Sequence, residues 1–339
     1  MTNTAEKILE VKDLKIEFVS KDSSLTAVNG VSFHINKGEI LGLVGESGCG
    51  KTVTSLAIMR LFKDTNGKIT EGGIHFKNQD ITTVSDREMA VMRGEEISMI
   101  FQEPLTSLNP VMRIGDQICE VVLKHTKKTR SEAMQIAKEM LDQVGIPRAE
   151  QVLRDYPHQL SGGMNQRVMI AMAMSLNPEL LIADEPTTAL DVTIQAQILD
   201  LMRRINRDHG MSMLLITHDL GVVAEMCQRV IVMYAGRIVE QADVVDLFKS
   251  PQHPYSKGLI NSVPVIGRRS DRLESIPGNV PTLAKMPSGC KFAPRCKYKT
   301  ERCEREEPGL FAVTGGRQER SCRCWLLAED TGEREEAVR

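Results

Sequence analysis

The segment that most constrains this 339-residue chain is Gly-Glu-Ser-Gly-Cys-Gly-Lys-Thr at residues 45–52. It fits the phosphate-loop pattern GxxxxGK[ST], between an apolar run at 40–44 that predicts a buried strand and a helical pattern at 53–61. Glycines in the loop allow the backbone to curl, so that N–H groups and the helix N-terminus face a polyphosphate. The segment predicts an α/β fold that binds a nucleotide.

The side chains of this loop have separate expected tasks. Lys51 would reach the β and γ phosphates, and the Thr52 hydroxyl is placed to ligate Mg2+. The residues predicted to contact the nucleotide are Gly45, Ser47, Gly48, Cys49, Gly50, Lys51 and Thr52. The alternative is a glycine-rich strand-to-helix turn in which Lys51 is merely solvated.

A second segment, residues 180–185, is an apolar run of strand length that ends in two carboxylates. A buried parallel strand would deliver both to the edge of a sheet. Asp184 is the expected partner of Mg2+, in its first or second sphere, and Glu185 is the candidate general base for an attacking water. Alone, such a pair is more often a helix cap or a loop start. Together with the phosphate loop it predicts a nucleotide-hydrolysing site.

Residues 160–167, Leu-Ser-Gly-Gly-Met-Asn-Gln-Arg, directly precede an apolar helix pattern. A serine hydroxyl and two glycines at a helix N-terminus form an anion site. Here the chain resembles the ATP-binding subunits of ABC transporters, whose signature LSGGxxQR it matches. The resemblance implies that this segment closes over the γ-phosphate held by a partner subunit, so that two ATP molecules lie in a head-to-tail dimer. The residues expected to act in trans are Ser161, Gly162, Gly163 and Gln166.

Other positions follow from the same resemblance. Gln102 matches the loop glutamine that senses Mg2+ and the attacking water, and that links the site to the membrane subunits. His218 matches the switch histidine that contacts the γ-phosphate, so the resemblance makes these two residues catalytic together with Glu185. Ala-Leu-Asp at 189–191 matches the loop that crosses the dimer interface, so Asp191 is also expected in trans. Phe18 matches the aromatic residue that stacks on adenine, where many members carry tyrosine.

Composition agrees with a cassette that has its membrane pore on other chains. The chain is 41% hydrophobic and 26% charged, and its net charge is −2. No apolar run approaches the roughly 18 to 20 residues that span a bilayer, and the N-terminal residues lack the apolar core of a signal peptide. The near-neutral charge gives no broad basic footprint for nucleic acid. The expected location is the cytoplasmic face of the cell membrane, as a peripheral subunit.

The expected fold is an α/β P-loop NTPase of the ABC cassette type, with a mixed, mainly parallel sheet. We expect an ATP-binding domain at 1–260, with an inserted helical subdomain at 105–165, and a small cysteine-rich extension at 261–339. In the subdomain, 129–144 is a clear amphipathic helix pattern in which Thr129 and Glu132 have the spacing of a capping box.

Three segments narrow the resemblance. Ser-Pro-Gln-His-Pro-Tyr at 250–255, the cysteine-bearing 289–296 and Glu-Pro-Leu-Thr-Ser-Leu-Asn-Pro at 103–110 resemble the ATPases of oligopeptide and dipeptide importers. The implied partners are a second ABC ATPase, two transmembrane permease subunits and an extracellular or periplasmic substrate-binding protein. Importers of nickel and other small solutes share the pattern. A soluble ABC ATPase acting on nucleic acid is disfavoured by the single phosphate loop and single signature.

Five of the eight cysteines fall in the last 50 residues, at positions 290, 296, 303, 322 and 324. A cytosolic chain does not use these as structural disulfides, and the spacing is too wide for the usual C-x2-4-C pairs of zinc sites. The resemblance implies a [4Fe-4S] cluster held by Cys290, Cys296, Cys303 and Cys324. Cys322 remains an alternative fourth ligand, and zinc or free thiols remain alternatives to the cluster.

Overall fold

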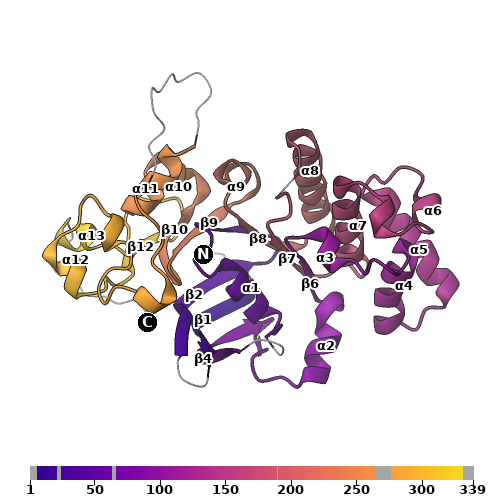
Figure 1. Ribbon diagram of the computed structural model, residues 1–339, viewed down its shortest axis with the longest axis horizontal. Coiled ribbons are helices and arrows are strands. Elements are labelled where there is room, and N and C mark those ends of the chain that lie inside the picture. The colour runs from indigo at the N-terminus through magenta and orange to yellow at the C-terminus, as the bar shows by residue number, and fades with distance from the viewer. Residues whose placement is uncertain (1–5, 21–23, 63–65, 189, 264–275, 331–339) are drawn as a thin grey trace. The chain divides into compact units, whose positions relative to one another are not determined.

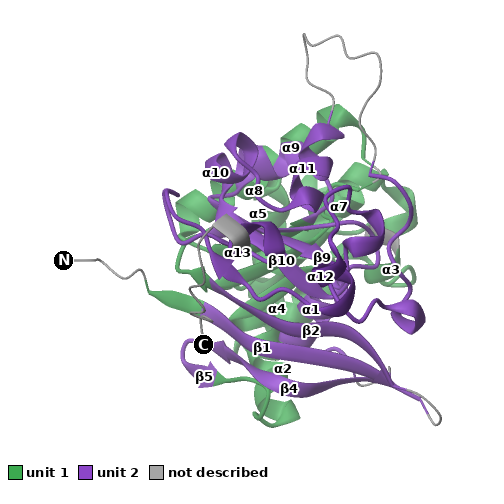
Figure 2. Ribbon diagram, turned by 90° about the vertical axis from the view of Figure 1, so that its left-hand side faces the viewer, with its two compact units in different colours: residues 1–8, 35–39, 80–216 green, residues 9–34, 40–79, 217–339 purple. Residues whose placement is uncertain are grey.

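The computed structural model describes residues 6–20, 24–62, 66–188, 190–263 and 276–330 (Figure 1). Its contacts divide the chain into two compact units, coloured separately in Figure 2. Unit 1 comprises residues 1–8, 35–39 and 80–216, and unit 2 comprises 9–34, 40–79 and 217–339. Within the described residues, no helix is both long and apolar enough to cross a bilayer.

The parallel strands of unit 1 carry the predicted carboxylate segment. They are β6 (Ile97–Ile100), β7 (Leu180–Asp184) and β8 (Ser212–Thr217). β7 pairs in parallel with both neighbours, with Leu180 opposite Ile97 on one side and opposite Ser212 on the other. Every residue of the three strands is buried, which explains why they read as continuous apolar runs.

Helices account for most of the remainder of unit 1. They are α2 (Asp86–Glu95), α3 (Pro104–Ser107), α4 (Ile114–His125), α5 (Arg130–Gln143), α6 (Ala149–Val152), the 3-10 turn η1 (Pro157–Gln159), α7 (Gly162–Met174) and α8 (Val192–His209). Helices α4, α5 and α7 pack on one another. The predicted capping box of α5 is confirmed, because the Glu132 carboxylate accepts a 2.6 Å hydrogen bond from the Thr129 N–H.

Unit 2 contains two groups of strands. A four-stranded sheet has the order β2-β1-β4-β5, formed by β2 (Ser24–Asn36), β1 (Lys7–Val19), β4 (Gly67–Phe76) and the short β5 (Gln79–Asp80), and β1 is antiparallel to β4. In the second group β3 (Ile40–Val44) runs parallel to β9 (Arg229–Tyr234), and β10 (Arg237–Asp243) is antiparallel to β9. Helix α1 (Lys51–Ile58) follows β3 through the phosphate loop, as the sequence predicts.

The cysteine-rich extension continues this second group of strands. β12 (Ser321–Cys322) pairs with β10, and β11 (Phe311–Ala312) pairs with β12. The other helical elements of unit 2 are α9 (Leu220–Met226), α10 (Val244–Lys249), α11 (Pro254–Asn261), η2 (Leu283–Lys285), η3 (Ala293–Arg295), α12 (Glu301–Arg305) and α13 (Trp325–Asp330). The extension thus shares a compact unit with the phosphate loop.

Candidate functional site

The phosphate loop of unit 2 has the curled backbone that its glycines predict. Gly45, Gly48 and Gly50 have φ values of 156°, 80° and 102°, which side-chain-bearing residues rarely adopt. A Cβ on Gly45 would also lie 2.3 Å from the carbonyl oxygen of Met233. Both the turn and the close approach of β9 therefore require glycine at this position.

The lysine of the phosphate-loop pattern, Lys51, lies folded against its own loop. Lys51 Nζ donates hydrogen bonds to the carbonyl oxygens of Gly45, at 2.7 Å, and Glu46, at 3.2 Å. Ser47, Gly48 and Thr52 are exposed, and no side chain caps the N-terminus of α1. The open face of the loop therefore offers backbone N–H groups, a cation and a hydroxyl to an anion.

Three other predicted residues of unit 2 occupy different surroundings. Cys49 is fully buried, and burial raises the pKa of its thiol, so its contribution to a ligand is limited to the backbone. Phe18 is half-buried near the end of β1, opposite Gly67. His218 is exposed in the turn before α9, a helix capped by the carboxylate of Asp219 at 2.8 Å from the Gly221 N–H.

Unit 1 brings the predicted general base and the loop glutamine together. The Glu185 carboxylate accepts hydrogen bonds from Gln102 Nε2, at 3.1 Å, and from Thr188 Oγ1, at 2.9 Å. Glu185 has a φ of 47°, and its N–H donates to the Ile216 carbonyl at 2.8 Å. A left-handed glutamate is strained, and such strain is typical of functional positions.

Asp184, at the end of β7, is 2% exposed, whereas Glu185 is half-buried and Thr188 is exposed. The strand thus directs one carboxylate inward and turns the next one toward its polar neighbours. Thr188 was not among the residues predicted from the sequence. The one local feature that could have identified it is a hydroxyl-bearing residue three positions after the glutamate.

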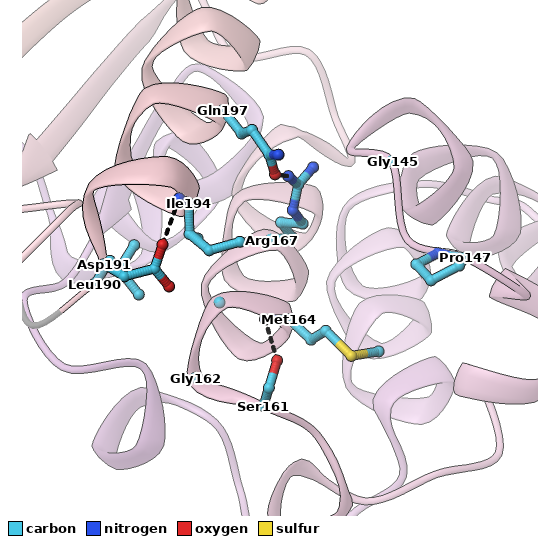
Figure 3. Close-up of a pocket in the computed structure, with 11 residues that line it drawn as sticks. Gly145, Pro147, Ser161, Gly162, Met164, Arg167, Leu190, Asp191, Ile194 and Gln197 are labelled. Carbon is cyan, nitrogen blue, oxygen red and sulfur yellow. Dashed lines mark hydrogen bonds between the residues drawn. The ribbon is translucent and has the colours of Figure 1, made fainter.

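The signature segment lines a cavity of about 520 Å3 in unit 1 (Figure 3). Ser161 caps α7 and accepts a hydrogen bond from the Met164 N–H at 3.3 Å, and Asp191 caps α8 and accepts one from the Ile194 N–H at 2.9 Å. Two helix N-termini therefore meet at this cavity, and their partial positive charge favours an anion. The full lining is Gly145, Pro147, Ser161, Gly162, Gly163, Met164, Arg167, Leu190, Asp191, Ile194 and Gln197.

The two signature glycines have different surroundings. A Cβ on Gly162 would meet nothing within 4 Å, whereas one on Gly163 would lie 2.9 Å from Cγ2 of Ile194. Gln166 is 2% exposed and does not line the cavity, unlike the other predicted residues of this segment. Ala189, the first residue of the predicted interface loop, lies outside the described residues.

Arg167, the last residue of the signature match, and Gln197 also line the cavity, and neither was among the site residues expected from the sequence. Arg167 Nη2 donates a 2.8 Å hydrogen bond to Gln197 Oε1, which joins α7 to α8 beside the two caps. The position of this pair depends on the packing of the two helices and not on a local pattern.

In the extension, the four cysteines singled out by the family resemblance line one pocket. These are Cys290, Cys296, Cys303 and Cys324, with Phe292 and Trp325 among their neighbours. Cys322 is fully buried on β12 and is not part of that lining. Burial, with the nearby thiols, raises the pKa of Cys324 to about 11. Among the described residues, no group of three or more His, Cys, Asp or Glu is arranged to hold a single metal ion.

Comparison with known proteins finds sequence matches over most of the chain. Residues 28–188 match the family model described as ABC transporter, and residues 239–303 match the one described as oligopeptide/dipeptide transporter, C-terminal region. The chain is 53% identical to the oligopeptide transport ATP-binding protein AppD of Bacillus subtilis, over 96% of this chain and 98% of AppD. It is 49% identical to the oligopeptide transport ATP-binding protein OppD of Salmonella typhimurium, over 92% of each chain.

A solved structure agrees with these sequence matches. The ATP-binding cassette MJ0796, solved as a dimer in a post-hydrolysis state bound to ADP and Pi, superposes with a TM-score of 0.63 and 26% identity. The match covers 70% of this chain and 98% of that cassette. It confirms the predicted cassette fold, and the sequence matches confirm the predicted subfamily. The chain belongs to the ABC transporter family, among the ATP-binding proteins of oligopeptide and dipeptide transport.

Proposed function

We propose that this chain is the ATP-hydrolysing subunit that energises import of oligopeptides or dipeptides through a multisubunit ABC transporter. The observation that carries the proposal is the identity of about half of all residues, over nearly the full length, to ATP-binding proteins named for oligopeptide transport. The match of residues 239–303 to the C-terminal region of oligopeptide and dipeptide transporters supports the substrate class.

In this proposal the phosphate loop binds the β and γ phosphates of ATP through its N–H groups and the N-terminus of α1. Lys51 exchanges its bonds to the loop carbonyls for bonds to phosphate, and such charge-assisted bonds are the stronger ones. Thr52, Asp184 and Gln102 would hold Mg2+, which would neutralise charge on the phosphates. Phe18 stacks on adenine, and His218 contacts the γ-phosphate.

Glu185 is the general base in this scheme. Hydrogen bonds from Gln102 and Thr188 already orient its carboxylate. The attacking water then has to donate one hydrogen bond to that carboxylate to be positioned for proton transfer. The orienting bonds also explain how a glutamate is kept in a strained backbone conformation.

The other half of each site comes from a partner ATPase. We propose that Ser161, Gly162, Gly163 and Asp191, with Gln166 behind them, serve the nucleotide of that partner. The cavity between the caps of α7 and α8 supports this role, and so does Val192, an apolar residue that is 83% exposed beside Asp191. The dimeric cassette described above is a precedent for paired subunits.

Two permease subunits and a substrate-binding protein complete the proposed transporter, with this chain at the cytoplasmic face of the membrane. Val111, which is 79% exposed between α3 and α4, provides an apolar contact for a permease on the predicted helical subdomain. Purification with the native partners, followed by uptake of dipeptides, longer peptides and nickel, tests the substrate class. Nickel uptake without peptide uptake would replace peptide by the alternative solute.

The chemistry is tested by Glu185→Gln, which keeps the side-chain shape and removes the base. We expect ATP hydrolysis by the assembled transporter to collapse while ATP binding persists. Glu179→Gln is the matched control, because Glu179 is an exposed glutamate that precedes β7 at its opposite end. Lys51→Ala should instead lose ATP binding itself. Wild-type turnover in Glu185→Gln would show that another group is the base.

We also propose that Cys290, Cys296, Cys303 and Cys324 hold a [4Fe-4S] cluster. Support comes from their shared pocket and from the absence of Cys322 from it. Four cysteine thiolates are the ligands that such a cluster needs, and among the described residues these four are not arranged to hold a single metal ion. The cluster would fasten a segment with few regular elements, because metal ligation supplies folding free energy.

The cluster is tested on anaerobically purified protein by iron and acid-labile sulfide, each expected at about four per chain. Cys324→Ser should lose the cluster, and Cys322→Ser is the matched control that should keep it. Zinc in place of iron would make this a four-cysteine zinc module, and no metal under anaerobic conditions would leave free thiols.

A further inference from the structure

The second residue of the phosphate loop, Glu46, is held at each of its polar groups. Its N–H donates a 2.8 Å hydrogen bond to the hydroxyl of Tyr255. Its carbonyl oxygen accepts from Lys51, and its carboxylate forms a bidentate pair with Arg295, at 2.5 and 3.0 Å. Two of these partners come from outside the loop, 209 and 249 residues further along the chain.

Arg295 comes from the cysteine-rich extension and is itself fixed. It ends the short turn η3, and its side chain is 4% exposed, against 29% for the side chain of Glu46. Its Nε donates to the Pro277 carbonyl at 2.8 Å, and its guanidinium lies 5.8 Å from the ring centre of Tyr234. The hydrogen-bonded carboxylate raises the pKa of Arg295, so the guanidinium stays charged.

The aromatic residues around this pair connect it to the cysteine pocket. Phe292 lies 5.2 Å from Tyr234 and 5.5 Å from Tyr255, measured between ring centres, and it also lines the cysteine pocket. Since η3 lies between Cys290 and Cys296, the fold of that short segment sets the position of both Phe292 and Arg295. The extension and the phosphate loop are therefore packed through one aromatic cluster.

The charge balance shows what this arrangement does for a polyphosphate. A carboxylate in a loop that binds phosphates repels the ligand, and a bidentate arginine cancels that charge and fixes its direction. The Glu46 N–H is already occupied by Tyr255, so the anion-binding face of the loop begins at Ser47. The hydrogen bonds of Glu46 to Tyr255 and Arg295 thus fix the conformation of the loop.

We propose that the C-terminal extension sets the affinity of the phosphate loop for ATP, with Arg295 as a positioning residue that acts through Glu46. Arg295 neutralises the carboxylate, and together with Tyr255 it holds the loop in its curled form before the nucleotide arrives. The effect on ATP rests on the function proposed above, whereas the effect on the loop does not.

The main test compares variants of the full chain assembled with its native partners. Arg295→Gln should raise KM for ATP about tenfold, the effect of losing about one charge-assisted hydrogen bond, and should leave kcat within about twofold. Adding Glu46→Gln removes the uncompensated charge and should return KM to within about threefold of wild type. Arg295→Lys keeps the charge without the bidentate geometry and should give an intermediate KM.

Arg237→Gln is the matched control, because Arg237 pairs with Glu307 of the extension at 2.7 Å and has no contact to Glu46. It should leave KM within about twofold of wild type. An unchanged KM in Arg295→Gln, an equal increase in Arg237→Gln, or no recovery in the double variant would overturn the proposal. Thermal unfolding of each variant confirms that it is folded at the assay temperature.

Hydrogen exchange of the nucleotide-free chain tests the loop without any ATP chemistry. Arg295→Gln should speed exchange of the amides at 45–50, and Arg237→Gln should not. Lys51→Ala separates the two proposals: if it leaves ATP binding intact, the proposed ATP site is wrong, whereas the exchange result still decides the role of Arg295. Unchanged exchange in Arg295→Gln would contradict the proposal that Arg295 holds the loop in its curled conformation.

Discussion

At the scale of single residues, the site depends on backbone conformations that few side chains tolerate. The glycines of the phosphate loop have positive φ values, and so does Glu185 despite its side chain. Glycine adopts these conformations without steric cost, whereas the glutamate is held by the bonds its carboxylate accepts from Gln102 and Thr188 and by the bond its N–H donates to the Ile216 carbonyl. Function is thus built on a few positions where sequence choice is narrow.

Gly162 and Gly163 provide a matched test of packing at this scale. Gly163→Ala should be less stable than Gly162→Ala by about 1 kcal/mol, because only the former pushes a Cβ into Ile194. Thermal or urea unfolding of both variants measures the difference. In the double variant Gly163→Ala with Ile194→Ala the two losses should be less than additive, and strict additivity would contradict the contact.

At the scale of elements, helix ends determine where charge is placed. Ser161 and Asp191 cap the two helices whose N-termini meet at the signature cavity, so the same side chains end the helices and shape the anion site. Helix α5 begins with a capping box between Thr129 and Glu132 instead of a lone serine or aspartate cap.

The capping box of α5 makes a pH prediction. The N–H and the hydroxyl of Thr129 lower the pKa of Glu132 below its ordinary 4.5 in the folded chain. The stabilisation is therefore fully present above about pH 4.5 and is lost as the pH falls through the lower folded value. Protection factors of the amides at the start of α5 should decline in that range.

Glu132→Gln should remove this dependence, because its amide does not titrate. Glu139→Gln changes a carboxylate further along the same helix and should leave the dependence unchanged. A decline that persists in Glu132→Gln would assign it to another group.

At the scale of the whole molecule, the extension is joined to the strands that follow the phosphate loop. Glu240 on β10 is fully buried and accepts hydrogen bonds from Arg320 Nη2, at 3.1 Å, and from the N–H groups of Gln252 and His253, each at 2.9 Å. β12 pairs with β10 at the same place, with Cys322 opposite Glu240. This carboxylate therefore fastens three segments of unit 2 at once.

Glu240→Gln should lower the free energy of unfolding of unit 2 by about 3 to 5 kcal/mol, because it leaves the buried Arg320 without a counter-charge. Limited proteolysis should then cut the extension faster than in the wild type. Glu304→Gln is the control, since its ion pair with Lys299 is exposed and screened by solvent. Equal effects of the two variants would show that burial of the pair is not what matters.

The division into domains stays a prediction at this scale. The helical subdomain expected at 105–165 falls within unit 1, and the extension expected at 261–339 falls within unit 2 together with the phosphate loop. Within the extension, Phe292 is buried against Tyr234 of the same unit, and Ala293 is also buried. A local search for apolar periodicity misses such a core, because its apolar residues do not recur at a helical or strand spacing.

Sequence alone determined the parts whose physical cause is local. The glycine pattern of the loop, the carboxylates after a buried strand, the serine that caps α7 and the capping box of α5 are each encoded within about ten residues. Backbone sterics, strand burial and helix-end hydrogen bonds act over that distance, so they leave a readable pattern.

Only the tertiary structure decided the contacts between distant segments. It joined Arg295 to Glu46 and Gln102 to Glu185, and it put Cys324 rather than Cys322 beside the other three cysteines. Each of these depends on which strands pair and which faces pack, so the partner of a charge or thiol is set by long-range geometry. A sequence pattern identifies a charged residue or a cysteine, whereas the packing of distant segments determines which residue it contacts.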